Sequence, residues 1–372
     1  MKYEDIVELK KRMDFNLTES ETLVELVKEA ITKGEKVQKE MQRLKGLSAD
    51  VSTFLSDNKL IRDGSWLEAV QLTHSCVVGI DGSFQLVGGA GGKWFAPISV
   101  ARILFEKGLW SQPTVDVFSA RIEEIDEKDD PKPNVVAEVL MLSGETKAIL
   151  NWGAQNKSSY IFLDGPIVDP PVFSYGGKDY VKDRCQAIKT CLASSHMIGC
   201  VKRSRDKFFV EHMQKQFPQM TRGKILAEFP SDQHLFAYVF SHFRSSGYKG
   251  PIFTVPIDIS TVNPVYKSYM DHGINIACLF LQKGVMSQVL RLDIPFERSS
   301  TQDEKRVANE IAHIAKSVDQ WTYPGQDYPL PVYLAHQKCN IREGCAEVLY
   351  DEIMTKSYST DPTNQTILSQ LR

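Results

Sequence analysis

The stretch Cys76–Phe84, with the sequence CVVGIDGSF, decides how the rest of the chain is interpreted. Its first five residues are apolar or glycine, as is typical of a short buried strand. The strand would end on the carboxylate of Asp81, which Gly82 follows at once. An Asp-Gly pair after a strand is also the commonest signal for a hairpin turn, so one such copy alone favours a turn.

The same pattern returns about eighty residues later, in the stretch Tyr160–Pro166 with the sequence YIFLDGP. Here the apolar run stops at Asp164 and Gly165. If the two strands are neighbours in one sheet, Asp81 and Asp164 lie side by side. Two adjacent carboxylates repel each other unless a cation lies between them, so the pair predicts a cation site.

The composition is that of a globular protein, with 372 residues, 42% of them hydrophobic and 24% charged. The net charge of −3 excludes a surface coated with positive charge, so any contact with nucleic acid would use a local basic groove. The seven cysteines are scattered and none forms a CxxC pair, which disfavours a structural zinc site. The sequence shows no apolar leader and no run of about 20 apolar residues, so we expect a cytoplasmic protein without a membrane anchor.

Three regions are predicted along the chain. Residues 1–75 are rich in Glu, Lys, Leu and Val at helical spacing and are expected to form an N-terminal helical arm, which packs on its own domain or on a second copy. Residues 76–355 alternate predicted strands and helices and are expected to form the main α/β domain. Residues 356–372 are expected to be a polar tail.

Other candidate residues occur between and after the two aspartates. A predicted helix over Asn134–Trp152 carries Glu138 among apolar residues. A predicted strand over Met197–Val201 is followed by Lys202–Lys207, where four of six residues are basic and could hold phosphates. His336 comes late in the chain.

This order is what an RNase H-like domain with a bound divalent metal requires. The predicted fold is therefore a mixed α/β sheet flanked by helices, with the intervening helix bringing Glu138 to the two aspartates. Carboxylate oxygens favour Mg²⁺ or Mn²⁺, and an added imidazole shifts the preference toward Mn²⁺. Two such ions roughly 4 Å apart can activate a water molecule and stabilise the leaving oxygen in phosphodiester cleavage.

In these motifs the sequence resembles the NurA nucleases over about residues 76–345. The resemblance rests on the ordered set Gly79–Ser83, Glu138, Phe162–Gly165, Gly199–Ser204 and Tyr333–His336. It implies a manganese-dependent nuclease that is a single-strand endonuclease and a 5'-3' exonuclease on DNA ends. It also implies a homodimer that works beside a HerA-type hexameric translocase in DNA end resection and double-strand break repair.

The resemblance also implies roles for particular residues. Asp81, Glu138 and Asp164 match the metal carboxylates, and His336 matches a metal ligand or a proton-handling group. Lys202 would stabilise the attacked phosphate. The expected contacts to the DNA strand are Lys202, Arg203, Arg205, Lys207 and Tyr333.

Several alternatives remain open at this point. Glu145 lies two helical turns after Glu138 and points to a similar face, so either could be the helix carboxylate. His336 could instead be a core histidine. The chain could also be a catalytically silent DNA-binding or scaffolding subunit of a translocase complex, or an enzyme of the same fold that acts on RNA or branched DNA.

Overall fold

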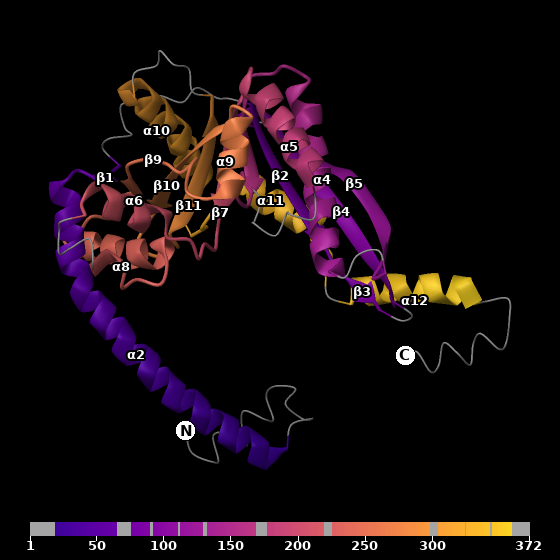
Figure 1. Ribbon diagram of the computed structural model, residues 1–372, viewed down its shortest axis with the longest axis horizontal. Helices are drawn as coiled ribbons and strands as arrows, with labels where there is room; N and C mark the ends of the chain where they lie inside the picture. Colours follow the sequence, from indigo (N-terminus) through magenta and orange to yellow (C-terminus); the bar gives the residue numbers. More distant parts are fainter. Residues whose placement is uncertain are drawn as a thin grey trace.

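The protein is represented by a computed structural model, which describes residues 19–64, 76–89, 92–110, 112–128, 132–168, 177–218, 225–297, 304–323, 325–342 and 344–358. Within these residues one mixed sheet runs through the molecule and helices cover both of its faces (Figure 1). The predicted α/β fold, a mixed sheet flanked by helices, is confirmed.

The strands that the structure describes are β1 (Ile61–Asp63), β2 (Cys76–Phe84), β3 (Val87–Gly88), β4 (Lys93–Leu109), β5 (Thr114–Asp126), β6 (Ser159–Asp164), β7 (His196–Val201), β8 (Ile252–Thr254), β9 (Ile257–Asp258), β10 (Asn275–Gln282) and β11 (Leu290–Phe296). The helices are α2 (Ser20–Asp57), α4 (Pro133–Gly153), α5 (Gly177–Leu192), α6 (Phe208–Gln216), α8 (Asp232–Arg244), α9 (Pro264–Asp271), α10 (Glu304–Trp321), α11 (Leu330–Cys339) and α12 (Cys345–Tyr358).

The part of the sheet that positions the site has the spatial order β5-β4-β2-β6-β7. The strands β2, β4 and β5 form an antiparallel meander, whereas β6 and β7 run parallel to β2. This is the RNase H-like arrangement expected from the sequence. The remaining strands extend the sheet beyond β7, where β11 pairs antiparallel with β7.

Side chains of β2 alternate between two hydrophobic layers because successive residues of a strand point to opposite faces. Val78 and Ile80 belong to a core that also contains residues of α2, α4, α5 and α8. Val77 belongs to the opposite core, with residues of α10 and α11. Asp81, four residues after Val77, therefore faces α11.

The N-terminal arm is the helix α2, which extends away from the body in Figure 1. At 1.5 Å per residue its 38 residues span roughly 57 Å. Its C-terminal half is anchored to the core by Val51, Phe54 and Leu55, whereas Leu26 and Val37 in its outer half are exposed.

The boundaries predicted at residues 75 and 355 remain predictions. Much of the 356–372 tail lies outside the described residues, and α12 continues to Tyr358. In the part of the chain that the structure describes, no helix combines the length and the hydropathy that crossing a membrane requires.

Candidate metal centre

Asp81 and Asp164 come together through the pairing of β2 with β6. The parallel register ends at Ile80 and Leu163, so the two aspartates are the next residues of their strands. Both point to the face of the sheet that α11 covers, and both are largely buried. The parallel arrangement thus brings the two predicted carboxylates to one edge of the sheet.

His336 is brought to the same place by the close packing of α11 on β2. Gly79 makes this packing possible, because a Cβ at this position would lie only 2.2 Å from the carbonyl oxygen of Pro331. Pro331 is in the first turn of α11, and His336 follows in the next turns. A side chain at position 79 would therefore push the helix and its histidine away from the aspartates.

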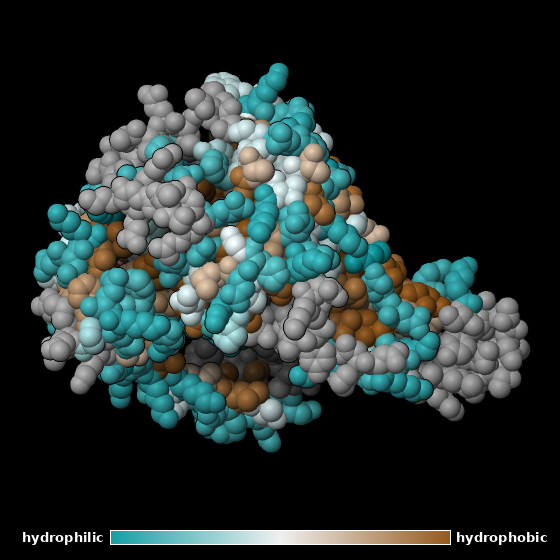
Figure 2. Space-filling view, turned by 45° about the horizontal axis from the view of Figure 1, so that its top comes forward, coloured by the Kyte–Doolittle hydropathy of each residue, from teal (hydrophilic) through white to brown (hydrophobic). Residues whose placement is uncertain are grey.

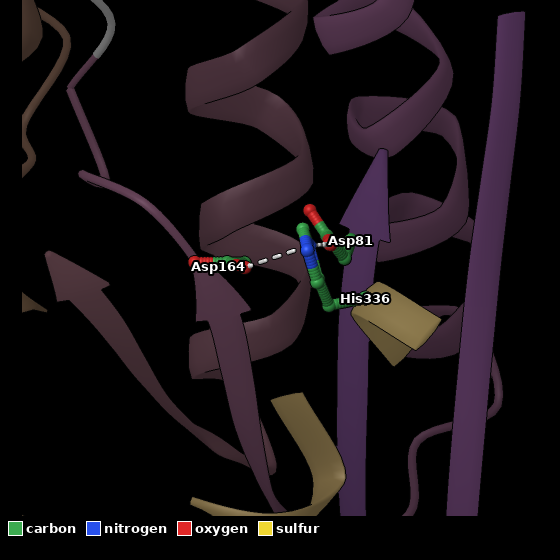
Figure 3. A group of neighbouring side chains, drawn as sticks. All are labelled: Asp81, Asp164 and His336. Carbon is green, nitrogen blue, oxygen red and sulfur yellow. Dashed lines mark hydrogen bonds and ion pairs between the residues drawn. The ribbon is translucent and has the colours of Figure 1, made fainter. Parts of the chain in front are cut away.

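The three side chains form one compact group (Figure 3). The Nδ1 atom of His336 lies 2.9 Å from Oδ2 of Asp81 and 3.6 Å from Oδ2 of Asp164. One donor atom from each residue lies within 4.8 Å of the other two. Two carboxylates and one imidazole at this spacing fit a divalent cation that prefers oxygen and accepts nitrogen, as Mn²⁺ does.

Electrostatic effects in the group also favour a cation. Burial and the nearby carboxylate of Asp81 raise the pKa of Asp164 to about 6, against the opposing effect of Lys202. The hydrogen bond to Asp81 raises the pKa of His336. A divalent ion would favour the ionised carboxylates and so offset the repulsion that raises the pKa of Asp164.

A thiol that was not among the predicted site residues also contacts the group. The Sγ–H of Cys339 donates to Oδ2 of Asp81 at 3.4 Å, one helical turn after His336. Burial, and then the carboxylates of Asp81, Glu145 and Asp164, raise the pKa of this thiol well above its ordinary value. Cys339 therefore acts here as a neutral hydrogen-bond donor to a metal-site carboxylate.

A helix carboxylate, that of Glu145, lies beside β2 next to Asp81. Glu145 is 2% exposed. Its Oε1 lies 2.9 Å from where a Cβ of Gly82 would be. Because Gly82 directly follows Asp81 and has no side chain, the Glu145 carboxylate reaches β2 beside Asp81 from the opposite face of the sheet. Glu138 lies roughly 10 Å earlier along α4 and is partly exposed, and neither glutamate belongs to the Asp81, Asp164 and His336 group. This approach to Gly82 favours Glu145 over Glu138, and the assignment of the helix carboxylate stays a prediction.

Lys202 lies directly after β7 and contacts the group through Asp164. Its Nζ is 2.6 Å from Oδ2 of Asp164 and 3.7 Å from the ring centroid of Tyr328. The aromatic ring attracts the ammonium group by a cation–π interaction. Lys202 is thereby held beside the predicted metal ligands, as a phosphate-stabilising residue would need to be.

The backbone after Lys202 is fixed by side chains from other elements. Gln233 donates to the carbonyl oxygen of Lys202 at 2.8 Å and accepts from the amide of Ser204 at 2.9 Å. The buried guanidinium of Arg291 donates to the Ser204 hydroxyl at 3.0 Å and also contacts Asp206. The basic segment is therefore a structured edge of the site.

The other predicted DNA contacts are distributed around this edge. Arg203 lines a cavity of about 540 Å³ next to Lys202, Tyr328 and His336. Arg205 is exposed, whereas Lys207 donates to the carbonyl oxygen of Ala227 and precedes α6. The ring of Tyr333 lies 6.1 Å from that of Tyr328. The structure thus places Arg203 nearest to Lys202 and does not bring Arg205 or Lys207 into the metal group.

Of the residues that the sequence-based prediction did not assign to the site, Tyr328 and Cys339 left a weak signal in the sequence. Both flank the Tyr333–His336 motif, but neither residue type by itself points to a metal centre. Glu145 was recognised only as an alternative. Their place in the site depends on the packing of α4 and α11, which sequence spacing does not specify.

Comparisons with known proteins identify the family and the fold. The family model described as NurA domain matches residues 30–341. The crystal structure of the NurA nuclease from Sulfolobus solfataricus is similar with a TM-score of 0.58 at 15% identity, covering 91% of this chain and 98% of that chain. A crystal structure of NurA with manganese gives a TM-score of 0.39 at 11% identity, covering 86% of this chain and 96% of that chain. No curated protein matches the chain. Since the family model covers most of the sequence, the chain belongs to the NurA nuclease family.

Proposed function

We propose that this protein is a manganese-dependent deoxyribonuclease that cleaves single-stranded DNA internally and degrades DNA ends in the 5'-3' direction. The observation that carries the proposal is the convergence of Asp81, Asp164 and His336 within 4.8 Å at one edge of the RNase H-like sheet. Their two carboxylates and one imidazole suit Mn²⁺, and Mg²⁺ is the alternative ion. Family membership supports the choice of reaction.

The residues of the site have separate roles in this proposal. Asp81, Asp164 and His336 would hold the metal, with Glu145 in place of Glu138 as the further carboxylate. Two divalent ions, when bound, would supply a metal-activated water and charge neutralisation on the leaving oxygen. Lys202 donates hydrogen bonds to a non-bridging oxygen of the attacked phosphate, since its ammonium group is positioned beside Asp164.

The path of the DNA strand would follow the basic edge after β7. Arg203 lines the cavity beside the site and provides a second positive charge for the backbone. Tyr333 would stack on or hydrogen-bond to the strand. Arg205 and Lys207 remain weaker candidates for more distant phosphates.

We further propose that the protein acts as a homodimer beside a HerA-type hexameric ATPase during DNA end resection and break repair in the cytoplasm. Family membership supports this assembly. The outer half of α2, with exposed Leu26 and Val37, is a candidate for the contact between the two protomers or for the contact with the ATPase. Light scattering of the purified protein and co-purification with a HerA-type ATPase, each compared with a variant lacking the outer half of α2, test these two contacts.

The main test is a Mn²⁺ titration of cleavage of a labelled single strand. A matched series of single-stranded DNA, RNA and hairpin DNA of equal length establishes the substrate class. Cleavage that requires Mn²⁺ and is lost in Asp81→Asn supports the proposal. DNA binding without cleavage at any Mn²⁺ or Mg²⁺ concentration would instead support the alternative of a silent DNA-binding or scaffolding subunit.

A further inference from the structure

The connection between β10 and β11 presents apolar side chains where a hairpin tip is ordinarily polar. Residues 283–289 make this connection, and we call them the β10–β11 tip. Within it Val285 is 56% exposed and Met286 is 91% exposed. Apolar side chains scattered singly on a surface need no explanation, but two consecutive ones at a projecting tip suggest a contact.

The tip is held firmly at its base. Lys283 forms an ion pair with Asp319, with Nζ 3.1 Å from Oδ1. The Gln282 side chain donates to the carbonyl oxygen of Ser287 at 2.9 Å. The backbone amide of Gln288 donates to Oδ1 of Asp327 at 2.8 Å. These contacts fix the chain on both sides of Val285 and Met286.

Strand pairing places the tip at the edge of the sheet that carries the metal group. β11 runs antiparallel to β7, with Arg291 opposite Val201, so β11 begins where β7 ends and Lys202 follows (Figure 1). The last two residues of the tip, Gln288 and Val289, line the cavity of about 540 Å³. Lys202 and His336 line the same cavity, so the chain that follows the exposed pair forms part of the wall beside the proposed active site.

The cavity chemistry fits one unpaired nucleotide. Lys202 and Arg203 offer positive charge for its phosphates, and Tyr328 and Val289 offer apolar wall for its base. A cavity of this size suits a single small-molecule-sized group, so we expect a strand to enter it unpaired. A duplex end must therefore be opened before a strand reaches the metal group.

We propose that the β10–β11 tip opens duplex ends, with Met286 and Val285 inserted against the last base pair while the freed nucleotide enters the cavity. Apolar side chains, Met among them, unstack bases when they are inserted between base steps. This inference rests on the proposed nuclease function and adds a strand-separating role that the metal group alone does not supply.

The test compares the double variant Val285→Ser/Met286→Ser with the unmodified protein on three substrates of one sequence. These are a single strand, a blunt duplex, and a duplex with three unpaired nucleotides at its ends. We expect blunt-duplex cleavage to fall on the order of 10-fold, the scale of one lost stacking contact, with cleavage of the other two substrates unchanged. Val348→Ser is the matched control, because Val348 is 68% exposed on α12, and all three rates should stay unchanged.

A binding measurement separates this inference from the nuclease function. A 2-aminopurine in the terminal pair should brighten when a blunt duplex binds the Asp81→Asn variant, and the added Ser substitutions should abolish the brightening. An unchanged signal on binding, or equal rate changes on all three substrates, would overturn the role of the tip. Absence of single-strand cleavage by the unmodified protein would instead overturn the proposed function, leaving the 2-aminopurine result to decide on the tip. Circular dichroism of each variant verifies folding.

Discussion

Asp81 and Asp164 are the next residues in register after the last paired residues of two adjacent parallel strands. Their carboxylates share one face of the sheet and one histidine, whose Nδ1 lies 2.9 Å from Asp81 and 3.6 Å from Asp164. Burial raises the pKa of the Asp164 carboxyl group, and the nearby negative charge of Asp81 raises it further.

Asp81 and Asp164 should be required for cleavage but not for folding. Asp81→Ala and Asp164→Ala should each abolish cleavage, because each removes a metal ligand, while DNA binding through the basic edge remains within a few-fold of normal. Cleavage assays together with fluorescence anisotropy of a labelled single strand measure both properties. Substantial cleavage by either variant would remove that residue from the metal site.

The helix carboxylate can be identified by a matched pair of substitutions on α4. Glu145→Gln should lower the cleavage rate by roughly 100-fold or more, the scale expected when a group that acts on the metal or the transition state is lost. Glu138→Gln should leave the rate nearly unchanged, because Glu138 is partly exposed and lies roughly 10 Å from Glu145 along α4, whereas Glu145 is buried beside Gly82. The reverse result would return the role to Glu138.

Lys202 should affect the chemical step more than DNA affinity. Lys202→Ala should slow cleavage on the order of 100-fold, because one transition-state donor is lost. Single-turnover rates at saturating Mn²⁺ and DNA measure this effect separately from binding. Lys207→Ala serves as the control, since its ammonium group contacts the Ala227 carbonyl instead of Asp164. A near-normal rate in Lys202→Ala would exclude Lys202 from the reaction.

Gly79 should be intolerant of a side chain. Gly79→Ala should destabilise the protein by about 2 kcal/mol or more and weaken Mn²⁺ binding, because the new Cβ would overlap the Pro331 carbonyl and displace α11. Gly46→Ala is the control on α2, where nothing lies within 4 Å of the added Cβ, and should stabilise the helix by up to about 1 kcal/mol. Thermal unfolding and Mn²⁺ titration test both variants.

The metal-free protein should lose stability as pH rises through the range in which Asp164 ionises. Its pKa is about 6 in the folded protein against an ordinary value of 3.8, so the folded state binds the proton more tightly. The resulting stabilisation is complete below pH 3.8 and is lost by about pH 6. The raised pKa of His336 extends the decline to higher pH, since protonated His336 is stabilised by Asp81.

For Asp164 this change amounts to about 3 kcal/mol at most. It is measured as the difference in unfolding free energy between the unmodified protein and Asp164→Asn, with a chelator present. Mn²⁺ should stabilise the protein most above pH 6, because protons then no longer compete for Asp164. A difference that does not change between pH 4 and 6 would contradict this coupling.

The sequence by itself determined the strands that carry the two aspartates and the order of the main elements. The apolar runs Cys76–Ile80 and Tyr160–Leu163 are typical of buried strands and form parts of β2 and β6. β6 ends at Asp164 as expected, but the expected end of the first strand at Asp81 is wrong, because β2 continues through Gly82 to Phe84 by pairing with β4. The same local signals identified the basic segment after β7. The order of the motifs was sufficient to identify the family, because this order is a property of the sequence alone.

Only the tertiary structure indicates which helix carboxylate, thiol and aromatic ring lie near the proposed site. Glu138 and Glu145 differ by two helical turns, so their spacing could not separate them, whereas the approach of α4 to Gly82 does. Cys339 and Tyr328 enter through the packing of α11 and its preceding loop against distant strands. Such contacts depend on how closely the helices pack on the sheet. Gly79 and Gly82 permit close packing, but no local sequence pattern specifies it.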